Sequence, residues 1–350
     1  MKSVVVMLVV DDLEDREGEV KSLAKTAGYS VLKVFFQSSK PRPRFLVGSG
    51  KVDEVKGFIV ENSVELVIFE NLLSSRQTMS LEGVFGVPVI DKFDLILNVF
   101  EQHARTKEAK LQIELVRLKR KIPYLKMFMN KKIKEEHPGF GGSGEFIIHS
   151  TITAIHHRIK KIEERLGKFQ DRLERQRRRR RKEGKAVSLV GYTNAGKTTL
   201  LNALTHTDKR TNDELFTTLS TKTASFALKD KTVFINDTIG FIRDLPHDLI
   251  YAFRATLGDI RDSDLILLVL DVSESAEKIL KKKDICENML VEIGADAIPR
   301  LFILNKNDKR GDLVEGVISE DHIFLSAEYG GGLKTLKGEL EKKLISIDEK

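Results

Sequence analysis

The sequence predicts an α/β protein in three parts: a small parallel α/β domain at residues 1–100, an antiparallel helical hairpin at 101–182, and a doubly wound α/β domain at 183–350. Three observations predict this order. Strand and helix signals alternate in the first part, two heptad repeats fill the middle, and a glycine-rich loop pattern lies between a strand and a helix in the last. With 41% hydrophobic residues, the chain can form separate packed cores.

The first hundred residues read as short strands alternating with helices. We expect strands near 4–10, 29–36, 65–69 and 87–90, and helices near 13–27, 51–62 and from 92 onward. Such alternation is typical of a parallel sheet with crossover helices. Gly48-Ser-Gly-Lys51 looks like half of a phosphate loop, but its spacing does not fit, and we interpret it as a turn into a helix.

The middle third carries two heptad repeats. Apolar residues recur at alternating spacings of four and three, first at Leu111, Leu115, Leu118 and Ile122, then at Ile155, Ile159, Ile162, Leu166, Phe169 and Leu173. Such seams predict two helices that pack against each other. The glycine-rich stretch 137–144 between them is expected to be a non-helical connection.

The charge of this hairpin suggests a polyanionic partner. Residues 103–185 hold 25 Lys and Arg against ten Asp and Glu, a net charge of +15, while the whole chain carries +7. An electrostatic footprint for nucleic acid fits this concentration, and few aromatics interleave it, which favours backbone contacts to folded RNA. A solvated helix face and an acidic membrane surface are the alternatives. The predicted RNA contacts are Arg177, Arg178, Arg179, Arg180 and Arg181.

A phosphate-binding loop is predicted at residues 191–198, which match G-x-x-x-x-G-K-[ST] between an apolar strand and a leucine-rich helix. Lys197 would reach the β- and γ-phosphates, and the Thr198 hydroxyl would bind Mg²⁺. The residues expected to hold the phosphates are Asn194, Ala195, Gly196, Lys197, Thr198 and Thr199.

Two further patterns predict a metal ligand and switch segments. Asp237 begins a D-x-x-G match after an apolar strand, so its carboxylate would hold Mg²⁺ and the Gly240 N–H would sense the γ-phosphate. Thr217 and Thr218 are both candidates for the first-switch threonine. Phe241 stands where many GTPases carry a glutamine that orients water, which predicts slow intrinsic hydrolysis and stimulation by a partner.

The base is predicted to be guanine. Asn305, Lys306 and Asp308 form an N-K-x-D match after a strand, and Ser326-Ala327 follows the next strand. A carboxylate at Asp308 can accept two hydrogen bonds from guanine, whereas adenine lacks that pair of donors. Four motifs in this order, each at a strand's end, predict a site for GTP and GDP with Mg²⁺.

The composition indicates in which cellular compartment the protein functions. Cys286 is the only cysteine, so an internal disulfide is excluded and a reducing cytoplasm is expected. The apolar runs fall short of the ~20 residues that span a bilayer, so we expect no membrane insertion. We expect a monomer.

The motifs resemble those of the HflX family of GTPases. The similarity lies in the runs 191–202 and 215–219, above all in 237–247, and in the order of the domains. It implies a GTPase that binds the large ribosomal subunit and its rRNA, is stimulated by it, and separates ribosomal subunits under stress. The resemblance also selects Thr218 as the first-switch threonine and Mg²⁺ ligand. Lys197, Thr218 and Gly240 are then the expected catalytic residues.

A second class of function stays open. The chain could be an RNA-binding GTPase switch that serves as a scaffold, or in RNA modification, with little turnover of its own. The sequence also departs from the family in the first switch, where Ser220-Thr-Lys222 replaces the usual Asp-Pro-Thr.

Overall fold

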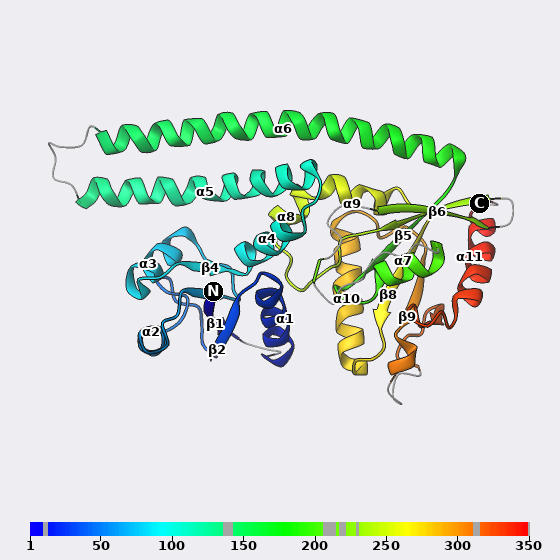
Figure 1. Cartoon of the computed structure of the whole chain (residues 1–350), viewed down its shortest axis with the longest axis horizontal. Helices are drawn as coiled ribbons and strands as arrows, with labels where there is room; N and C mark the ends of the chain where they lie inside the picture. Colours follow the sequence, from blue (N-terminus) through cyan, green and yellow to red (C-terminus); the bar gives the residue numbers. More distant parts are fainter. Residues whose placement is uncertain are drawn as a thin grey trace. The chain divides into compact units, whose positions relative to one another are not determined.

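The computed structural model describes residues 1–9, 13–135, 143–205, 215–216, 222–228, 231–310 and 316–348. The chain divides into two compact units (Figure 1). One comprises Met1–Gln102 and Lys110–Arg165, the other His103–Ala109 and Leu166–Lys350. The three predicted domain ranges stay predictions, because the second hairpin helix runs through both units.

The first unit contains a four-stranded parallel sheet, as predicted. Its strands are β1 (Lys2–Leu8), β2 (Ser30–Gln37), β3 (Leu66–Phe69) and β4 (Val89–Asp91), in the order β2-β1-β3-β4. Its helices are α1 (Leu13–Thr26), α2 (Ser49–Asn62), α3 (Ser75–Phe85) and α4 (Lys92–His103). Strand β1 is central, and its Val4, Val5 and Val6 are fully buried, as expected for a strand covered on both faces.

Two helices of this unit bear on the sequence analysis. Gly48 is the N-cap of α2, so the turn-into-helix interpretation of residues 48–51 is confirmed. Helix α3 was not predicted. It begins with a capping box in which Ser74 and Gln77 each bond the other's backbone N–H, a local signal that does not depend on hydrophobic periodicity.

The hairpin helices are α5 (Lys107–Glu135) and α6 (Ser143–Glu183), which run antiparallel (Figure 1). Glu114 Oε1 accepts from Arg158 Nε at 2.6 Å, joining the two helices. The expected connection was wrong at its end, since α6 begins at Ser143 and residues 143–144 are helical. Serine and glycine are well tolerated at a helix start. Residues 137–142 lie outside the described part of the chain.

The predicted seam is confirmed more fully on α6 than on α5. On α6, Ile155, Ile159 and Ile162 are buried. On α5 only Leu115 of the four predicted residues is buried, while the other three are half-buried. The reason is that α5 also packs on the α/β domain, where Tyr124 Oη donates to Glu82 Oε2 at 3.0 Å.

The second unit contains a six-stranded doubly wound sheet. Its strands are β5 (Gly184–Gly191), β6 (Lys222–Leu228), β7 (Lys231–Asp237), β8 (Leu265–Asp271), β9 (Arg300–Asn305) and β10 (His322–Phe324), in the order β10-β9-β8-β5-β7-β6. Every neighbouring pair is parallel except β6 with β7. The helices are α7 (Lys197–Thr205), α8 (His247–Ala252), α9 (Arg254–Arg261), α10 (Ala276–Glu292) and α11 (Leu333–Asp348), with a 3₁₀ turn, η1 (Asn307–Lys309).

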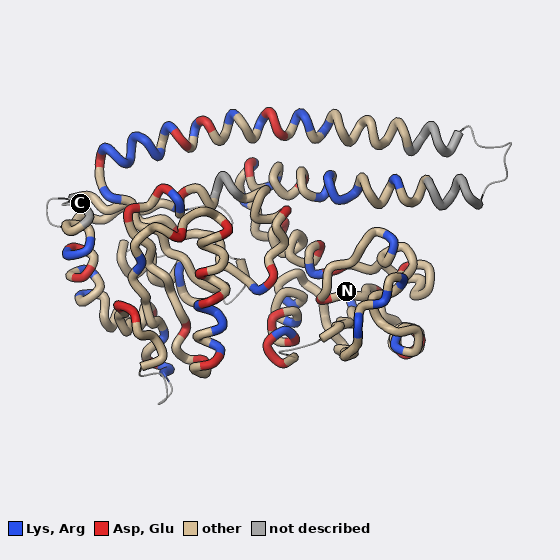
Figure 2. Tube along the Cα trace, turned by 180° about the vertical axis from the view of Figure 1, so that it is seen from behind, with Lys and Arg blue, Asp and Glu red and all other residues tan. Residues whose placement is uncertain are grey.

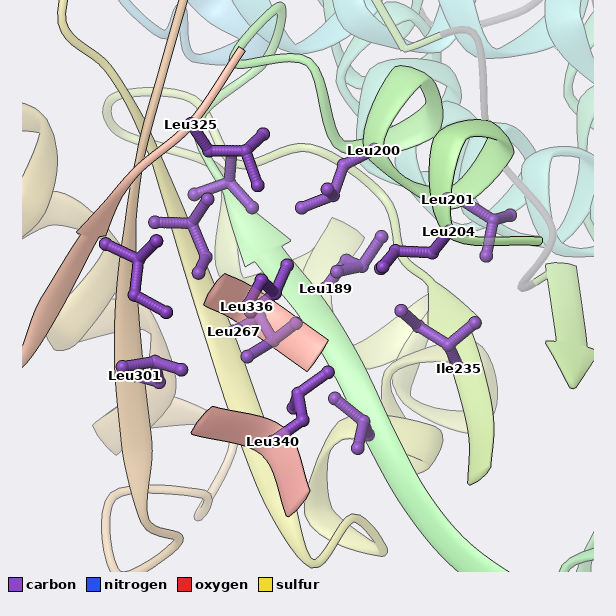
Figure 3. Close-up of a cluster of buried hydrophobic side chains, with 14 of the residues drawn as sticks. Leu189, Leu200, Leu201, Leu204, Ile235, Leu267, Leu301, Leu325, Leu336 and Leu340 are labelled. Atoms are coloured by element: carbon purple, nitrogen blue, oxygen red, sulfur yellow. The ribbon is translucent and has the colours of Figure 1, made fainter. Parts of the chain in front are cut away.

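The two faces of strand β5 are covered by different helices. Leu189 points into an apolar cluster that includes Leu200 of α7 and Leu336 of α11 (Figure 3). Its neighbour Ser188 points to the other face, where its Oγ donates to the main-chain oxygen of Asp259 in α9. Because β5, β7 and β9 are parallel, the motifs that follow them meet at one edge of the sheet.

Candidate nucleotide site

The phosphate loop leaves β5 at Gly191 and enters α7 at Lys197. Asn194 and Gly196 both take left-handed backbone angles, with φ of 62° and 89°. Glycine is required at Gly191, because a Cβ there would lie 2.3 Å from the main-chain oxygen of Val269. The loop therefore turns tightly into the start of a helix, where backbone N–H groups favour phosphate.

The Lys197 side chain crosses beneath the loop. Its Nζ donates to the main-chain oxygens of Gly191 at 3.0 Å and Tyr192 at 2.7 Å. Burial lowers the pKa of Lys197 to about 8, against the opposing effect of the Asp237 carboxylate. Phosphate groups would favour the charged ammonium, so the lysine is placed to bind them.

The Thr198 hydroxyl and the Asp237 carboxylate adjoin each other. Thr198 Oγ1 donates to Asp237 Oδ2 at 2.7 Å, and Asp237 is fully buried at the end of β7. Hydroxyl and carboxylate oxygens are the donors that Mg²⁺ takes beside nucleotide phosphates, so the pair fits that ion. The third predicted ligand, Thr218, lies outside the described residues.

The segment after Asp237 is bound to the phosphate loop by its main chain. Phe241 N–H donates to the oxygen of Gly191 at 3.0 Å, and Thr193 N–H donates to the oxygen of Phe241 at 2.8 Å. A Cβ on Gly240 would lie 2.9 Å from Thr193 Cα and 3.0 Å from Lys197 Nζ, so only glycine fits there. The Phe241 side chain is 1% exposed and packs in the interior.

The predicted guanine loop is assembled beside the phosphate loop. Asp308 Oδ1 accepts from Ser326 Oγ at 2.5 Å, and this hydrogen bond lowers the pKa of Asp308, which keeps it a carboxylate. Lys306 takes a left-handed backbone, and its Nζ lies 2.6 Å from Asp271 Oδ2 at the end of β8. These positions leave the Asp308 carboxylate at the loop surface, where guanine donors can meet it.

Asn305 connects the two loops. Its Nδ2 donates to the main-chain oxygen of Ala195 at 2.9 Å, and its Oδ1 accepts from Ala327 N–H at 3.0 Å. A Cβ on Gly196 would lie 2.2 Å from this amide nitrogen. The phosphate motif, the N-K-x-D motif and the Ser-Ala pair are thus in direct contact. Thr199 lies in the first turn of α7.

The arginine run at the end of α6 (Figure 2) makes contacts that the sequence analysis did not foresee. Arg177 is 11% exposed, and its Nε lies 2.7 Å from Oδ1 of Asp259 in α9, itself 6% exposed. A Cβ on Gly258 would lie 2.7 Å from Arg177 Nη1, so the glycine makes room for the guanidinium. This is a largely buried ion pair between the basic helix and the nucleotide domain.

Two more arginines bond the same domain. Arg180 Nη1 donates to Thr223 Oγ1 at 2.7 Å, and Thr223 Oγ1 donates to Asn236 Oδ1, next to the predicted metal ligand. Arg181 Nη2 donates to Asp262 Oδ1 at 2.7 Å. Arg178 is exposed, and Arg179 is 82% exposed in a pair within its own helix. Arg178, Arg179 and Arg181 are thus the exposed members of the five predicted RNA contacts.

The described residues contain no cluster of three or more His, Cys, Asp or Glu side chains suited to a metal ion. A site with few protein ligands, completed by phosphates and water, is what Mg²⁺ commonly takes. Among the helices that the structure describes, none has the length and apolar composition to cross a membrane.

Three families of known proteins match successive parts of the chain between residues 14 and 306. Residues 14–101 match the family described as GTP-binding GTPase N-terminal, 103–180 match GTP-binding GTPase Middle Region, and 186–306 match 50S ribosome-binding GTPase. GTPase HflX of Methanocaldococcus jannaschii is 36% identical over 332 residues, which is 91% of this chain and 80% of the relative. The chain belongs to the HflX family of GTPases.

A second relative and a solved structure show the same similarity. GTPase HflX of Escherichia coli K12 is 35% identical over 343 residues, covering 95% of this chain and 80% of its own. Among solved structures, a complex of SsGBP with GDP shares 27% identity at a TM-score of 0.54 and covers 99% of both chains. This HflX-family protein is therefore a GTP-binding and GTP-hydrolysing enzyme, as its motifs predicted.

Proposed function

We propose that this protein associates with the large ribosomal subunit and, driven by GTP binding, separates or rescues ribosomes under stress. The observation that carries the proposal is the ion pair of Arg177 with Asp259, which joins a long basic helix to the domain that carries the guanine nucleotide motifs. The match of residues 186–306 to the 50S ribosome-binding GTPase family supports the same partner.

The nucleotide chemistry follows from the site. Thr198 and Asp237 would hold Mg²⁺, and Thr218 would be a further ligand in the GTP state. Lys197 and the loop N–H groups stabilise the charge that develops on the phosphates. Phe241 cannot orient water, so rapid turnover depends on the ribosomal partner.

The RNA contacts are assigned to the exposed positive charges of the hairpin. On α6 these include Arg178, Arg179 and a row of exposed residues at Lys161, Arg165, Lys168 and Arg175. Phosphate contacts of this kind position a protein on RNA and weaken steeply with salt. Cytoplasmic localisation accords with this partner.

Co-sedimentation with purified large subunits tests the proposal. Binding should be stronger with a non-hydrolysable GTP analogue than with GDP. Changing exposed Lys161 and Lys168 to Gln should weaken binding and reduce the salt slope by about two. The matched control changes Lys334 and Lys342, two exposed lysines of α11, to Gln and should bind as the parent does. Equal binding by both variants would contradict the RNA contact.

Turnover separates this function from the scaffold alternative. A ribosome-stimulated enzyme should hydrolyse GTP in multiple turnovers much faster with large subunits than without them. An RNA-binding scaffold, or a partner in RNA modification, would bind subunits without acceleration.

A further inference from the structure

Tyr192, the second residue of the phosphate loop, contacts the second switch with its side chain. Its Oη accepts a hydrogen bond from the Arg243 N–H at 3.0 Å, and the residue is 8% exposed. Lys282 of α10 covers the ring, with Nζ 4.8 Å from the ring centroid. Both carboxylate oxygens of Glu274 hold that Nζ at 2.6 Å. The tyrosine is thus held by Lys282 at its ring and by the Arg243 N–H at its hydroxyl.

The backbone of the same residue takes part in a bridge. The β5–β7 pairing ends with Leu189 opposite Asp237, and the next pairing is a parallel bridge between Tyr192 and Phe241. The D-x-x-G side therefore contains one residue more than the loop side. These main-chain bonds could form with any residue at 192, whereas the bond to Arg243 requires the phenolic oxygen.

The contact restrains the segment that senses the γ-phosphate. Gly240 lies beside the Lys197 ammonium, and its N–H is the group expected to meet the γ-phosphate. Phe241 fixes the segment next to Gly240 through its main chain, and Tyr192 fixes it three residues on, at Arg243. Asp244 then turns the chain away with a left-handed φ of 51°.

We propose that Tyr192 is a positioning residue for GTP hydrolysis. Its hydroxyl holds residues 240–243 so that the Gly240 N–H stays presented to the γ-phosphate. The Phe241 side chain is apolar and buried, so it cannot orient the attacking water. The segment 240–243 is ordered instead by its contacts with the phosphate loop. A preorganised donor lowers the reorganisation needed at the transition state. Binding of GDP, which has no γ-phosphate, does not depend on it.

The substitution Tyr192→Phe tests this with the least disturbance, because it removes only the hydroxyl. In the full-length protein with Mg²⁺, kcat for basal GTP hydrolysis should fall about three- to tenfold, the effect of one lost hydrogen bond. KM for GTP and the affinity for GDP should stay within about twofold. Amide exchange of the peptide covering residues 240–245 should become faster in the GDP complex.

The matched control is Tyr251→Phe, which removes a hydroxyl from a tyrosine of α8 that is 69% exposed. It should leave kcat and amide exchange unchanged. An unchanged or increased kcat in Tyr192→Phe would overturn the proposal. So would parallel losses in kcat, GTP affinity and GDP affinity, since these would mean that the tyrosine merely shapes the phosphate loop.

Discussion

Arg177→Gln should strongly destabilise the nucleotide domain. The change leaves the carboxylate of Asp259 buried without the guanidinium that lies 2.7 Å away in the native protein. Removing one member of a buried ion pair costs about 3–5 kcal/mol, because the remaining charge loses its compensation. For a unit of this size each kcal/mol lowers Tm by about 2–4 °C, so a loss of about 6–20 °C is expected.

Scanning calorimetry of the full-length protein measures this effect. The transition that belongs to the nucleotide domain is the one that GDP shifts upward, because a ligand of the native state stabilises the part that binds it. Arg178→Gln is the matched control. It makes the same change of charge at an exposed neighbour and should shift stability by less than about 0.5 kcal/mol.

A double substitution tests the cause of the loss. Arg177→Gln with Asp259→Asn removes both charges, so the pair of changes should be less destabilising than the sum of the two alone. If Arg177→Gln melted at the same temperature as Arg178→Gln, or if the effects in the double variant were fully additive, the ion pair would not contribute specially to stability.

Three further outcomes are expected at the nucleotide site. Asp308→Asn should weaken GDP binding by about 1–3 kcal/mol, since an amide donor would face guanine donors, and an unchanged affinity by titration calorimetry would sink that assignment. GDP affinity of the parent should fall as pH rises above about 8, where Lys197 loses the proton that phosphates favour, and Lys197→Ala should bind weakly at every pH. A parent affinity constant up to pH 9.5 would contradict this. Phe241→Ala should reduce turnover with large subunits more than turnover without them, and the opposite order would point to a direct chemical role.

The nucleotide site could be predicted from the sequence because its parts are local. Each motif follows an apolar strand, and parallel strands bring their carboxyl ends to one edge of a sheet. Lys197, Asp237, Asn305 and Ser326 were located by short motifs, and this rule indicated that the motifs lie close together. The parallel first sheet was predictable for a similar reason, since strand and helix patterns alternate along it.

Long-range contacts could not be predicted in the same way. Arg177 and Arg180 lie four and seven residues beyond Leu173, the last apolar residue of the predicted seam of α6, and their charge suggested a solvated or RNA-bound face. Their partners lie 82 and 43 residues further along the chain. No local pattern reports such a pairing. Tyr192 escaped notice because the phosphate-loop pattern leaves its position open. Thr218 stays a prediction.

The single amide of Asn305 has a consequence for redesign of the nucleotide preference. Because the Asn305 side chain hydrogen-bonds both Ala195 and Ala327, the loop expected to bind the base and the loop expected to bind the phosphates are connected through one residue. A loop transplanted around Asp308 to accept another base would keep this connection only if it carried an asparagine that hydrogen-bonds both Ala195 and Ala327. Without that asparagine, the transplanted loop would weaken phosphate binding before it gained affinity for a new base. Changes of base preference in this scaffold should therefore keep Asn305 and alter the residues near it.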